Sequence, residues 1–359
     1  MSEGSASEPS VWNWPFTRSD LSAGLRRFLG DPSIRVEDVQ PASMPSRRPA
    51  IGRVRGALVS FETRRGSEQL SLVVKEPRGA TRTSLAGAGR REVGVYQSLA
   101  SQIPLRTPSL IAASPAGDWL VLDWVRSVRE PGAWKPEDYA RALENLAQLH
   151  DRFWGLSEDL EAYPWLGRPL DADFAVHVRA AAQAIQRIVQ TGKPEPLAAS
   201  PERMNVLARL STQAEDVVRP LRQQPGTLLH GDYWPGNVAI LDDGAQVVYD
   251  WQAASVGPAM CDLVGLVTKS LWWFGPSPSG PAEWVSLYRQ ALLELGGHRW
   301  DEADWSLLWD HALMWSFLQE WVDLLAASPD ALLAARAEQL EALWLDPVGR
   351  AVQERLPAL

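Results

Sequence analysis

The chain has 359 residues, of which 45% are hydrophobic and 22% charged, enough apolar material for one or two packed cores. Its net charge of −9 argues against a nucleic-acid partner, because duplex-binding proteins neutralise phosphates with basic surfaces. No apolar run reaches the about 18 residues of a membrane span, and the single cysteine excludes an internal disulfide framework. We therefore expect a cytoplasmic protein that binds neither membrane nor nucleic acid.

The first part of the chain alternates between short helical and strand-like patterns. Residues 1–10 are rich in Ser, Glu and Gly and predict a disordered tail without a secretory signal. A short helix is expected within residues 11–31, with Asp20 as its N-cap. Strands and one further helix follow and predict a small mixed sheet: strands at 34–39, 56–63, 70–75 and 118–125, and a helix at 90–100.

From Pro136 onward the sequence favours long helices. Pro136, followed by two acidic residues, makes a good helix start, and helical spacing continues to His150. Further helical patterns lie at 174–189, 201–222, 282–295, 304–326 and 330–345. A linker-like passage separates the two parts of the chain. The prediction is thus an α+β protein with two lobes, residues 11–128 and residues 129–359.

One strand-like island, residues 227–251, interrupts the helical half. It reads His-Gly-Asp-Tyr-Trp-Pro-Gly-Asn from His230, and an Asp-Gly dipeptide at Asp243 then predicts a hairpin turn. Asp232 and Asn237 precede the first strand of this hairpin, and Asp250 ends the second. Because the strands of a hairpin run antiparallel, these three side chains should converge at one end.

Two carboxylates and a carboxamide are the set that phosphoryl transfer requires. One carboxylate orients the attacking hydroxyl, and the other holds Mg²⁺, which prefers oxygen ligands. The spacing from Asp232 to Asn237 equals that of the protein-kinase catalytic loop. Taken alone, these two residues would also suit an Asx-capped turn. Asp250 at the end of the hairpin favours the catalytic interpretation.

This pattern resembles the aminoglycoside phosphotransferase and choline kinase superfamily, from about Val36 to Val267. Residues 257–263 resemble its Gly-x-x-x-x-Asp-Leu continuation, and residues 146–150 resemble the end of its first large-lobe helix. The Asp-Trp-Gln phrase at 250–252 leans toward the ecdysteroid-kinase-like branch. The resemblance implies a bilobal protein-kinase-like fold, with a small mixed β-sheet N-lobe containing one helix and a larger helical C-lobe.

The resemblance also assigns roles to five residues of the helical half. Asp232 would be the catalytic base or the hydroxyl-orienting group, and Asn237 and Asp250 would bind Mg²⁺. His230 would brace the loop that contains Asp232, a structural role rather than acid–base work. Asp262 would anchor the same loop.

The first lobe would bind the nucleotide. Lys75 ends an apolar run, where a lysine is costly unless it finds anions, so the kinase pattern predicts that it contacts the ATP phosphates. Glu92 on the following helix would hold it, although a snorkelling lysine and a solvated glutamate are the plain alternatives. Asp123 and Trp124 would meet adenine through main-chain atoms, although Trp124 could be only a core residue. Segment 40–56 departs from the kinase pattern, since it lacks the Gly-x-Gly-x-x-Gly loop.

The sequence thus predicts an ATP- and Mg²⁺-dependent kinase that phosphorylates a hydroxyl of a small molecule: an aminoglycoside-like antibiotic, an amino alcohol, a sugar or another metabolite. The alternatives are a non-catalytic nucleotide-binding pseudokinase-type module, a protein-kinase-like enzyme and a metal-dependent hydrolase. The tryptophans of the helical half, such as Trp305 and Trp321, could form a substrate pocket or simply the core. Glu320 and Asp323 could bind amines or hydroxyls, or face solvent. The sequence leaves the acceptor and the oligomeric state open.

Overall fold

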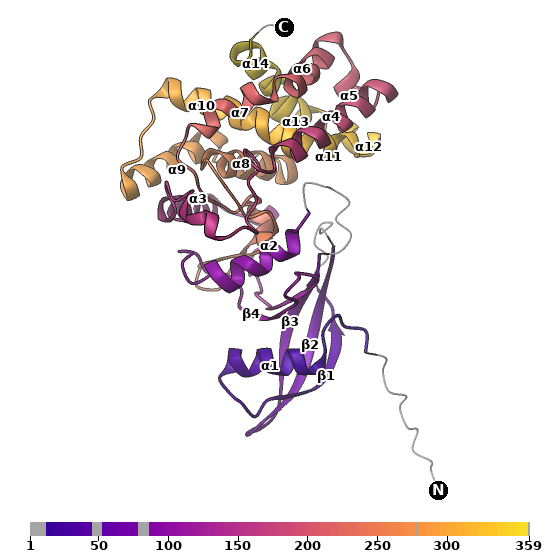
Figure 1. Cartoon of the computed structure of the whole chain (residues 1–359), viewed down its shortest axis with the longest axis vertical. Helices are drawn as coiled ribbons and strands as arrows, with labels where there is room; N and C mark the ends of the chain where they lie inside the picture. The colour runs from indigo at the N-terminus through magenta and orange to yellow at the C-terminus, as the bar shows by residue number, and fades with distance from the viewer. Residues whose placement is uncertain (1–11, 45–51, 78–85, 277–278, 358–359) are drawn as a thin grey trace. The chain divides into compact units, whose positions relative to one another are not determined.

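The computed structural model describes residues 12–44, 52–77, 86–276 and 279–357, so the predicted tail at 1–10 lies outside it. The chain forms two compact units (Figure 1). The first comprises residues 1–79 and 109–124, and the second comprises residues 80–108 and 125–359.

The first unit contains a five-stranded sheet in the order β1-β2-β3-β5-β4. Its strands are β1 (Arg35–Ala42), β2 (Arg53–Thr63), β3 (Gly66–Glu76), β4 (Leu110–Ala113) and β5 (Leu120–Asp123). Every pairing is antiparallel, so the prediction of a mixed sheet is wrong. The reason is that the chain returns after β3 through the short β4–β5 hairpin, which places β5 antiparallel to β3.

Helix α1 (Arg18–Leu29) packs against the sheet of the first unit (Figure 1). Leu21 and Leu25 of this helix are fully buried in the apolar cluster that the strands provide. The predicted N-cap, Asp20, is wrong, because Thr17 is the N-cap and Asp20 lies three residues later. The Thr17 hydroxyl accepts the N–H of Asp20 at 3.1 Å, and the Asp20 carboxylate accepts the N–H of Thr17 at 2.9 Å. Together these bonds form a capping box.

The second unit is mainly helical. Its helices are α2 (Ala88–Gly94), α3 (Pro136–Arg152), α4 (Phe174–Thr191), α5 (Glu195–Ala198), α6 (Pro201–Thr212), α7 (Ala214–Arg222), α8 (Met260–Phe274), α9 (Pro281–Gly296), α10 (Glu302–Ser316), α11 (Val322–Ala326), α12 (Asp330–Ala334), α13 (Ala337–Leu340) and α14 (Asp346–Arg355). Wider π-helical turns occur at η2 (Val95–Leu99), η7 (Phe317–Trp321) and η8 (Glu341–Leu345). No described helix is both long and apolar enough to cross a membrane.

The predicted helical patterns differ from the structure in several places. Residues 335–336 separate α12 from α13, where the sequence predicts one helix over 330–345. Gln213 separates α6 from α7, where the sequence predicts one helix over 201–222. Helix α8, for which we predicted no helix, begins directly after the island and contains the Asp262 side chain. Trp305 and Trp321 are 5% and 1% exposed, so these two belong to the core of the unit.

The predicted hairpin of the island is confirmed. Strands β7 (Val238–Ile240) and β8 (Gln246–Val248) pair antiparallel on either side of the Asp-Gly turn. Strand β6 (Thr227–Leu229) precedes this hairpin in the sequence and strand β9 (Ser255–Gly257) follows it, and these two strands pair antiparallel with each other. The residues before β7 and after β8 therefore lie at the same end of the hairpin.

Acid should destabilise the fold through buried histidines. His177 of α4 is 7% exposed, and burial lowers its pKa from 6.5 to about 4. Below pH 6.5 His177 binds a proton in the unfolded chain but stays neutral in the folded chain. The contribution of the neutral His177 to the free energy of unfolding is therefore complete above pH 6.5 and is lost as the pH falls toward 4. The loss approaches about 1.4 kcal/mol per pH unit for one histidine.

Thermal denaturation of the wild type and His177→Phe between pH 4.5 and 7.5 tests this. The variant should lose less Tm on acidification, because phenylalanine takes up no proton in the unfolded state. Parallel curves for the two proteins would contradict this role of His177.

Candidate active site

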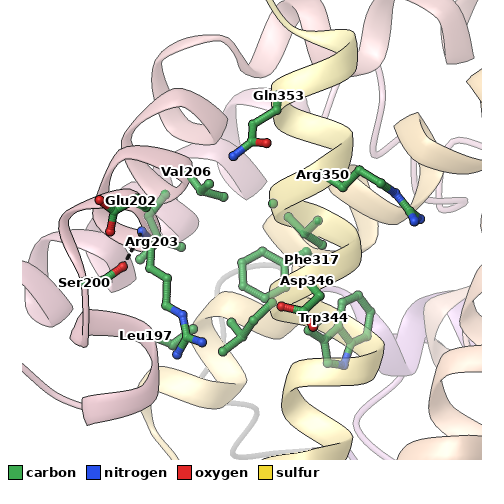
Figure 2. A pocket seen from close by; sticks show the side chains of 14 residues that line it. Leu197, Ser200, Glu202, Arg203, Val206, Phe317, Trp344, Asp346, Arg350 and Gln353 are labelled. Atoms are coloured by element: carbon green, nitrogen blue, oxygen red, sulfur yellow. Dashed lines mark hydrogen bonds between the residues drawn. The ribbon is translucent and has the colours of Figure 1, made fainter.

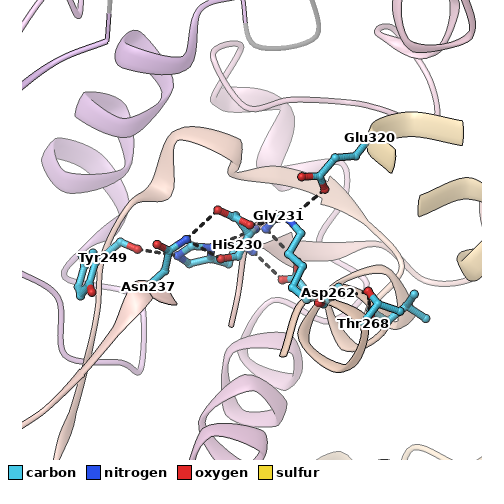
Figure 3. Close-up of polar contacts among 11 residues, drawn as sticks. His230, Gly231, Asn237, Tyr249, Asp262, Thr268 and Glu320 are labelled. Carbon is cyan, nitrogen blue, oxygen red and sulfur yellow. Dashed lines mark hydrogen bonds and ion pairs between the residues drawn. The ribbon is translucent and has the colours of Figure 1, made fainter. Parts of the chain in front are cut away.

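The loop of residues 230–237, which joins β6 to β7, is fixed by one buried carboxylate. Asp262, in the first turn of α8, accepts the backbone N–H of His230 at 2.7 Å and that of Gly231 at 2.8 Å (Figure 3). Its side chain is only 3% exposed. Because a buried carboxylate without donors is costly, these two bonds hold the start of the loop against the helix.

A second layer of side chains holds Asp262 in turn. His150, at the end of α3, is fully buried and lies with its Nε2 3.3 Å from the Asp262 carboxylate. Since a carboxylate only accepts, Nε2 donates the proton, and Nδ1 accepts the hydroxyl of Tyr288 at 2.5 Å. The loop is thus connected through Asp262 to both α3 and α9.

His230 connects the loop to the end of β8. Its Nδ1 accepts the N–H of Asp232 at 3.2 Å, and its Nε2 donates to the carbonyl of Tyr249 at 3.1 Å. Burial lowers the pKa of His230, so the neutral ring keeps this arrangement at neutral pH. The two nitrogens of the ring therefore connect Asp232, which precedes β7, to Tyr249, which follows β8.

Asp250 lies at the point where the chain turns away from β8. Its φ of 70° is left-handed, and no other described residue except glycine has a positive φ. The preceding residue, Tyr249, donates its N–H to the carbonyl of Asn237 at 3.0 Å. Beyond Asp250 the chain forms the short helical turn η6 (Trp251–Ala253), against which α2 packs. A strained aspartate beside Asn237 is typical of a functional position.

The Asp232 carboxylate has a donor on each oxygen. Nζ of Lys269, on α8, lies 2.5 Å from Oδ1, and Nδ2 of Asn237 lies 2.7 Å from Oδ2. The same lysine nitrogen is 2.9 Å from the carboxylate of Glu320 on η7, which Figure 3 shows reaching toward the loop. The side chain of Lys269 is 8% exposed, that of Asp232 23% and that of Glu320 37%, so the lysine is buried between two carboxylates that keep some contact with water.

The charges of this triad reinforce one another. Burial by itself raises the pKa of Asp232, but the ammonium of Lys269 outweighs it and lowers that pKa below the ordinary value. Burial likewise lowers the pKa of Lys269, and the carboxylates of Asp232 and Glu320 outweigh it and raise that pKa. Asp232 is therefore ionised and Lys269 protonated at neutral pH.

Asn237 and Asp250 form a donor set that suits Mg²⁺. Because Nδ2 of Asn237 donates to Asp232, its Oδ1 is the atom that faces away and could bind a cation. One or two protein oxygens suffice for Mg²⁺ when phosphates and water supply the rest. In the described part of the chain, no three His, Cys, Asp or Glu side chains gather into a metal site of their own. The chemistry of this pair fits a metal that arrives with a phosphate ligand.

The residues predicted to bind nucleotide lie in both units. Lys75 on β3 is 8% exposed, and Glu92 on α2 is fully buried. They belong to different units, so their pairing stays a prediction. Asp123 ends β5, where its carboxylate accepts the N–H of Ser109 at 2.5 Å and burial raises its pKa. Trp124 follows directly and lies against Gly56 of β2.

Sequence reasoning missed Lys269 and left the role of Glu320 open. A signal for Lys269 was present, since it is the one ionisable side chain in the run Leu-Val-Thr-Lys-Ser-Leu-Trp-Trp at 266–273. A lysine in so apolar a helix needs a buried anion. It also follows Asp262 by seven residues, which is two helical turns and hence the same face.

The cavities of the second unit include one beside the 230–237 loop and a larger one away from it. The larger, of about 330 Å³, lies between α6 and α14, with Arg203, Phe317 and Trp344 on its wall (Figure 2), and it contains none of the predicted site residues. The smaller, of about 80 Å³, is bordered by Gly231, Asp262 and the Lys269–Glu320 pair. The smaller cavity is therefore the one adjoining the 230–237 loop.

Substitution of Gly231 tests how closely the 230–237 loop packs against the residues around it. Its φ is +77°, and an added Cβ would clash with the carbonyl oxygen of Ala253. Gly244, in the hairpin turn, has the same φ of +77° but open space around it. Gly231→Ala should therefore lower the free energy of unfolding by about 1–3 kcal/mol more than Gly244→Ala, since only the first adds a steric clash. Urea denaturation measures both, and equal losses would contradict the close packing of the loop.

Comparisons with known proteins identify the family and the fold of the chain. The model of a family described as the phosphotransferase enzyme family matches residues 56–305. A search of curated proteins gives no match. Among solved structures, a thermostable mutant of the aminoglycoside phosphotransferase APH(4)-Ia, in a ternary complex with ADP and hygromycin B, is 18% identical, with a TM-score of 0.52 over 92% of this chain and 98% of that one.

Two further solved structures share the fold. Plasmodium vivax ethanolamine kinase is 12% identical, with a TM-score of 0.50 over 80% of this chain and 78% of its own. Amicoumacin kinase hAmiN, in complex with AMP-PNP and Ca²⁺, is 12% identical, with a TM-score of 0.50 over 87% of this chain and 88% of its own. The predicted resemblance to aminoglycoside and choline-kinase-like enzymes, and the predicted α+β kinase-like fold, are thereby confirmed. The chain belongs to the phosphotransferase enzyme family and is a phosphotransferase.

Proposed function

We propose that this enzyme transfers the γ-phosphoryl group of ATP to a hydroxyl of a small molecule, with Mg²⁺ as the metal. The observation that carries the proposal is the meeting of Asp232, Asn237 and the Asp250 turn at one end of the β7–β8 hairpin. Phosphoryl transfer requires little covalent chemistry from the protein, so positioning and charge are what a site must supply. Bound ADP in the APH(4)-Ia structure and AMP-PNP in the hAmiN structure support a nucleotide donor.

Asp232 is the group that receives the acceptor hydroxyl in this proposal. Its ionised carboxylate is fixed by Lys269 and Asn237, so a hydroxyl that donates to it would be held in one direction. The lowered pKa of Asp232 makes it a weak base, which suits orientation of the hydroxyl more than early removal of its proton. Positioning of this kind lowers the barrier by replacing a chance encounter with a fixed geometry.

Asn237 and Asp250 would hold Mg²⁺ through Oδ1 and a carboxylate oxygen. Bound there, the metal would neutralise the phosphate charge that develops during transfer. His230 and Asp262 would act on the loop rather than on substrate, since their described bonds go to the loop, to Tyr249 and to His150. They are positioning residues in this proposal.

The lobe of residues 11–128 would bind the nucleotide. Lys75 would contact the α and β phosphates and Glu92 would hold its ammonium, as the resemblance implies. In support, both side chains are buried, a costly placement for a lysine and a glutamate unless each has a charged partner. Main-chain atoms of Asp123 and Trp124 would meet adenine. A pseudokinase-type module is disfavoured because Lys75, Asp232, Asn237 and Asp250 are all present.

Substitution of the two aspartates should separate catalysis from nucleotide binding. Asp232→Asn should lower kcat by at least about 100-fold, because the hydroxyl loses its ionised acceptor, while MgATP affinity stays near that of the wild type. Asp250→Asn should weaken MgATP binding itself, because it removes a ligand charge from Mg²⁺.

Isothermal titration with MgATP, with ADP formation measured over a panel of alcohols, distinguishes the two effects. Asp243→Asn is the matched control, since this carboxylate is 61% exposed in the hairpin turn and should leave both quantities unchanged. Full turnover by Asp232→Asn, or undiminished MgATP affinity of Asp250→Asn, would contradict the assigned roles.

A further inference from the structure

The Lys269 ammonium lies between two carboxylates, those of Asp232 and Glu320. It is 2.5 Å from Asp232 and 2.9 Å from Glu320. Lys269 and its helix are well fixed, because Asp262 two turns earlier on α8 is bonded to the loop. The Lys269 ammonium therefore occupies the place that an ammonium group of the acceptor would take if that group lay next to the reacting hydroxyl.

An acceptor ammonium entering this place would meet a like charge. To bond to Asp232 or Glu320, it would have to approach within a few ångströms of the Lys269 nitrogen, which is itself in contact with both. The Lys269 side chain is 8% exposed, so little water is available to screen the repulsion. Lys269 also stays charged at neutral pH, because burial lowers its pKa less than the two carboxylates raise it.

The residues that line the adjoining 80 Å³ cavity support the same conclusion. Its charged lining residues are Asp262, Lys269 and Glu320. Asp262 accepts two backbone N–H groups, and the other two are paired with one another. Among the described lining residues, therefore, none offers an unpaired carboxylate to a cation, whereas Ser255 and Gln319 offer neutral hydrogen-bonding groups.

We propose that the acceptor is an uncharged alcohol, in which no ammonium group flanks the reacting hydroxyl, and that Lys269 sets this specificity. The inference rests on the proposed role of Asp232 as the group that orients the hydroxyl. In the transfer, the acceptor oxygen forms a bond to the γ-phosphorus, and the bond from that phosphorus to the β–γ bridging oxygen breaks. The bonding pair leaves with ADP, and the hydroxyl proton passes by way of Asp232 to solvent.

Matched pairs of acceptors test the inference directly on the full-length wild type. Suitable pairs differ by one hydroxyl replaced with an ammonium: ethylene glycol and ethanolamine, glycerol and 2-aminopropane-1,3-diol, glucose and glucosamine. With MgATP, and at a pH where the amines are protonated, we expect kcat/KM at least tenfold higher for the uncharged member of any pair that is used. Phosphorus NMR confirms that the product is a phosphate ester.

Lys269→Met and Lys269→Arg identify the residue responsible. Methionine keeps the length of the side chain but removes the charge, so the ratio of kcat/KM for ammonium to uncharged acceptors should rise at least tenfold. Arginine retains the charge and should retain the wild-type preference. A purely structural lysine would change all acceptors alike, leaving the ratio constant in Lys269→Met. Thermal denaturation verifies that each variant is folded.

Three results would overturn the inference: preference of the wild type for ammonium acceptors, no transfer to any uncharged member, or an unchanged ratio in folded Lys269→Met. Each of these is compatible with a working kinase if MgATP binds and some alcohol is phosphorylated. Failure of the proposed function would look different, since no acceptor would stimulate ADP formation and Asp250→Asn would not weaken MgATP binding.

Discussion

The hydrogen bonds from the His230 and Gly231 amides to the Asp262 carboxylate are the interaction on which the site depends. They join the loop before β7 to the first turn of α8 at 2.7 and 2.8 Å. Every other feature of the site follows from that junction: Asp232 lies one residue beyond it, and the ring of His230 reaches from it to the end of β8. Because the carboxylate is buried, it has no water to replace those donors.

Helix α8 serves the site at two levels. Its first turn supplies the anchor, Asp262, and two turns later it supplies the cation, Lys269. Helix α8 thus fixes the position of the Asp232 backbone through Asp262, and it supplies the positive charge that contacts the Asp232 carboxylate through Lys269. Groups on a single helix keep their spacing better than groups on loops, which favours a precise geometry for the reacting hydroxyl. The π-helical turn η7 completes the arrangement by presenting Glu320 to the same lysine.

The sequence alone predicted the parts of the site that depend on local chemistry. An Asp-Gly turn between two apolar runs implied the β7–β8 hairpin, and the hairpin implied that Asn237 and Asp250 lie at one end. It did not predict the partner of Asp232, because Lys269 is 37 residues away and nothing local indicates which buried anion a buried lysine meets. The prediction of a mixed sheet was wrong for a similar reason, since an alternating pattern indicates a strand but not the strand with which it pairs.

A crystal structure of the protein with Mg²⁺ and a non-hydrolysable ATP analogue tests the central claim most directly. Our account predicts that Asn237 Oδ1 and a carboxylate oxygen of Asp250 lie about 2.0–2.1 Å from Mg²⁺. It also predicts that Asp232 stays bonded to Lys269, outside the metal's coordination sphere. A metal bound by Asp232, or one bound without Asp250, would contradict the account.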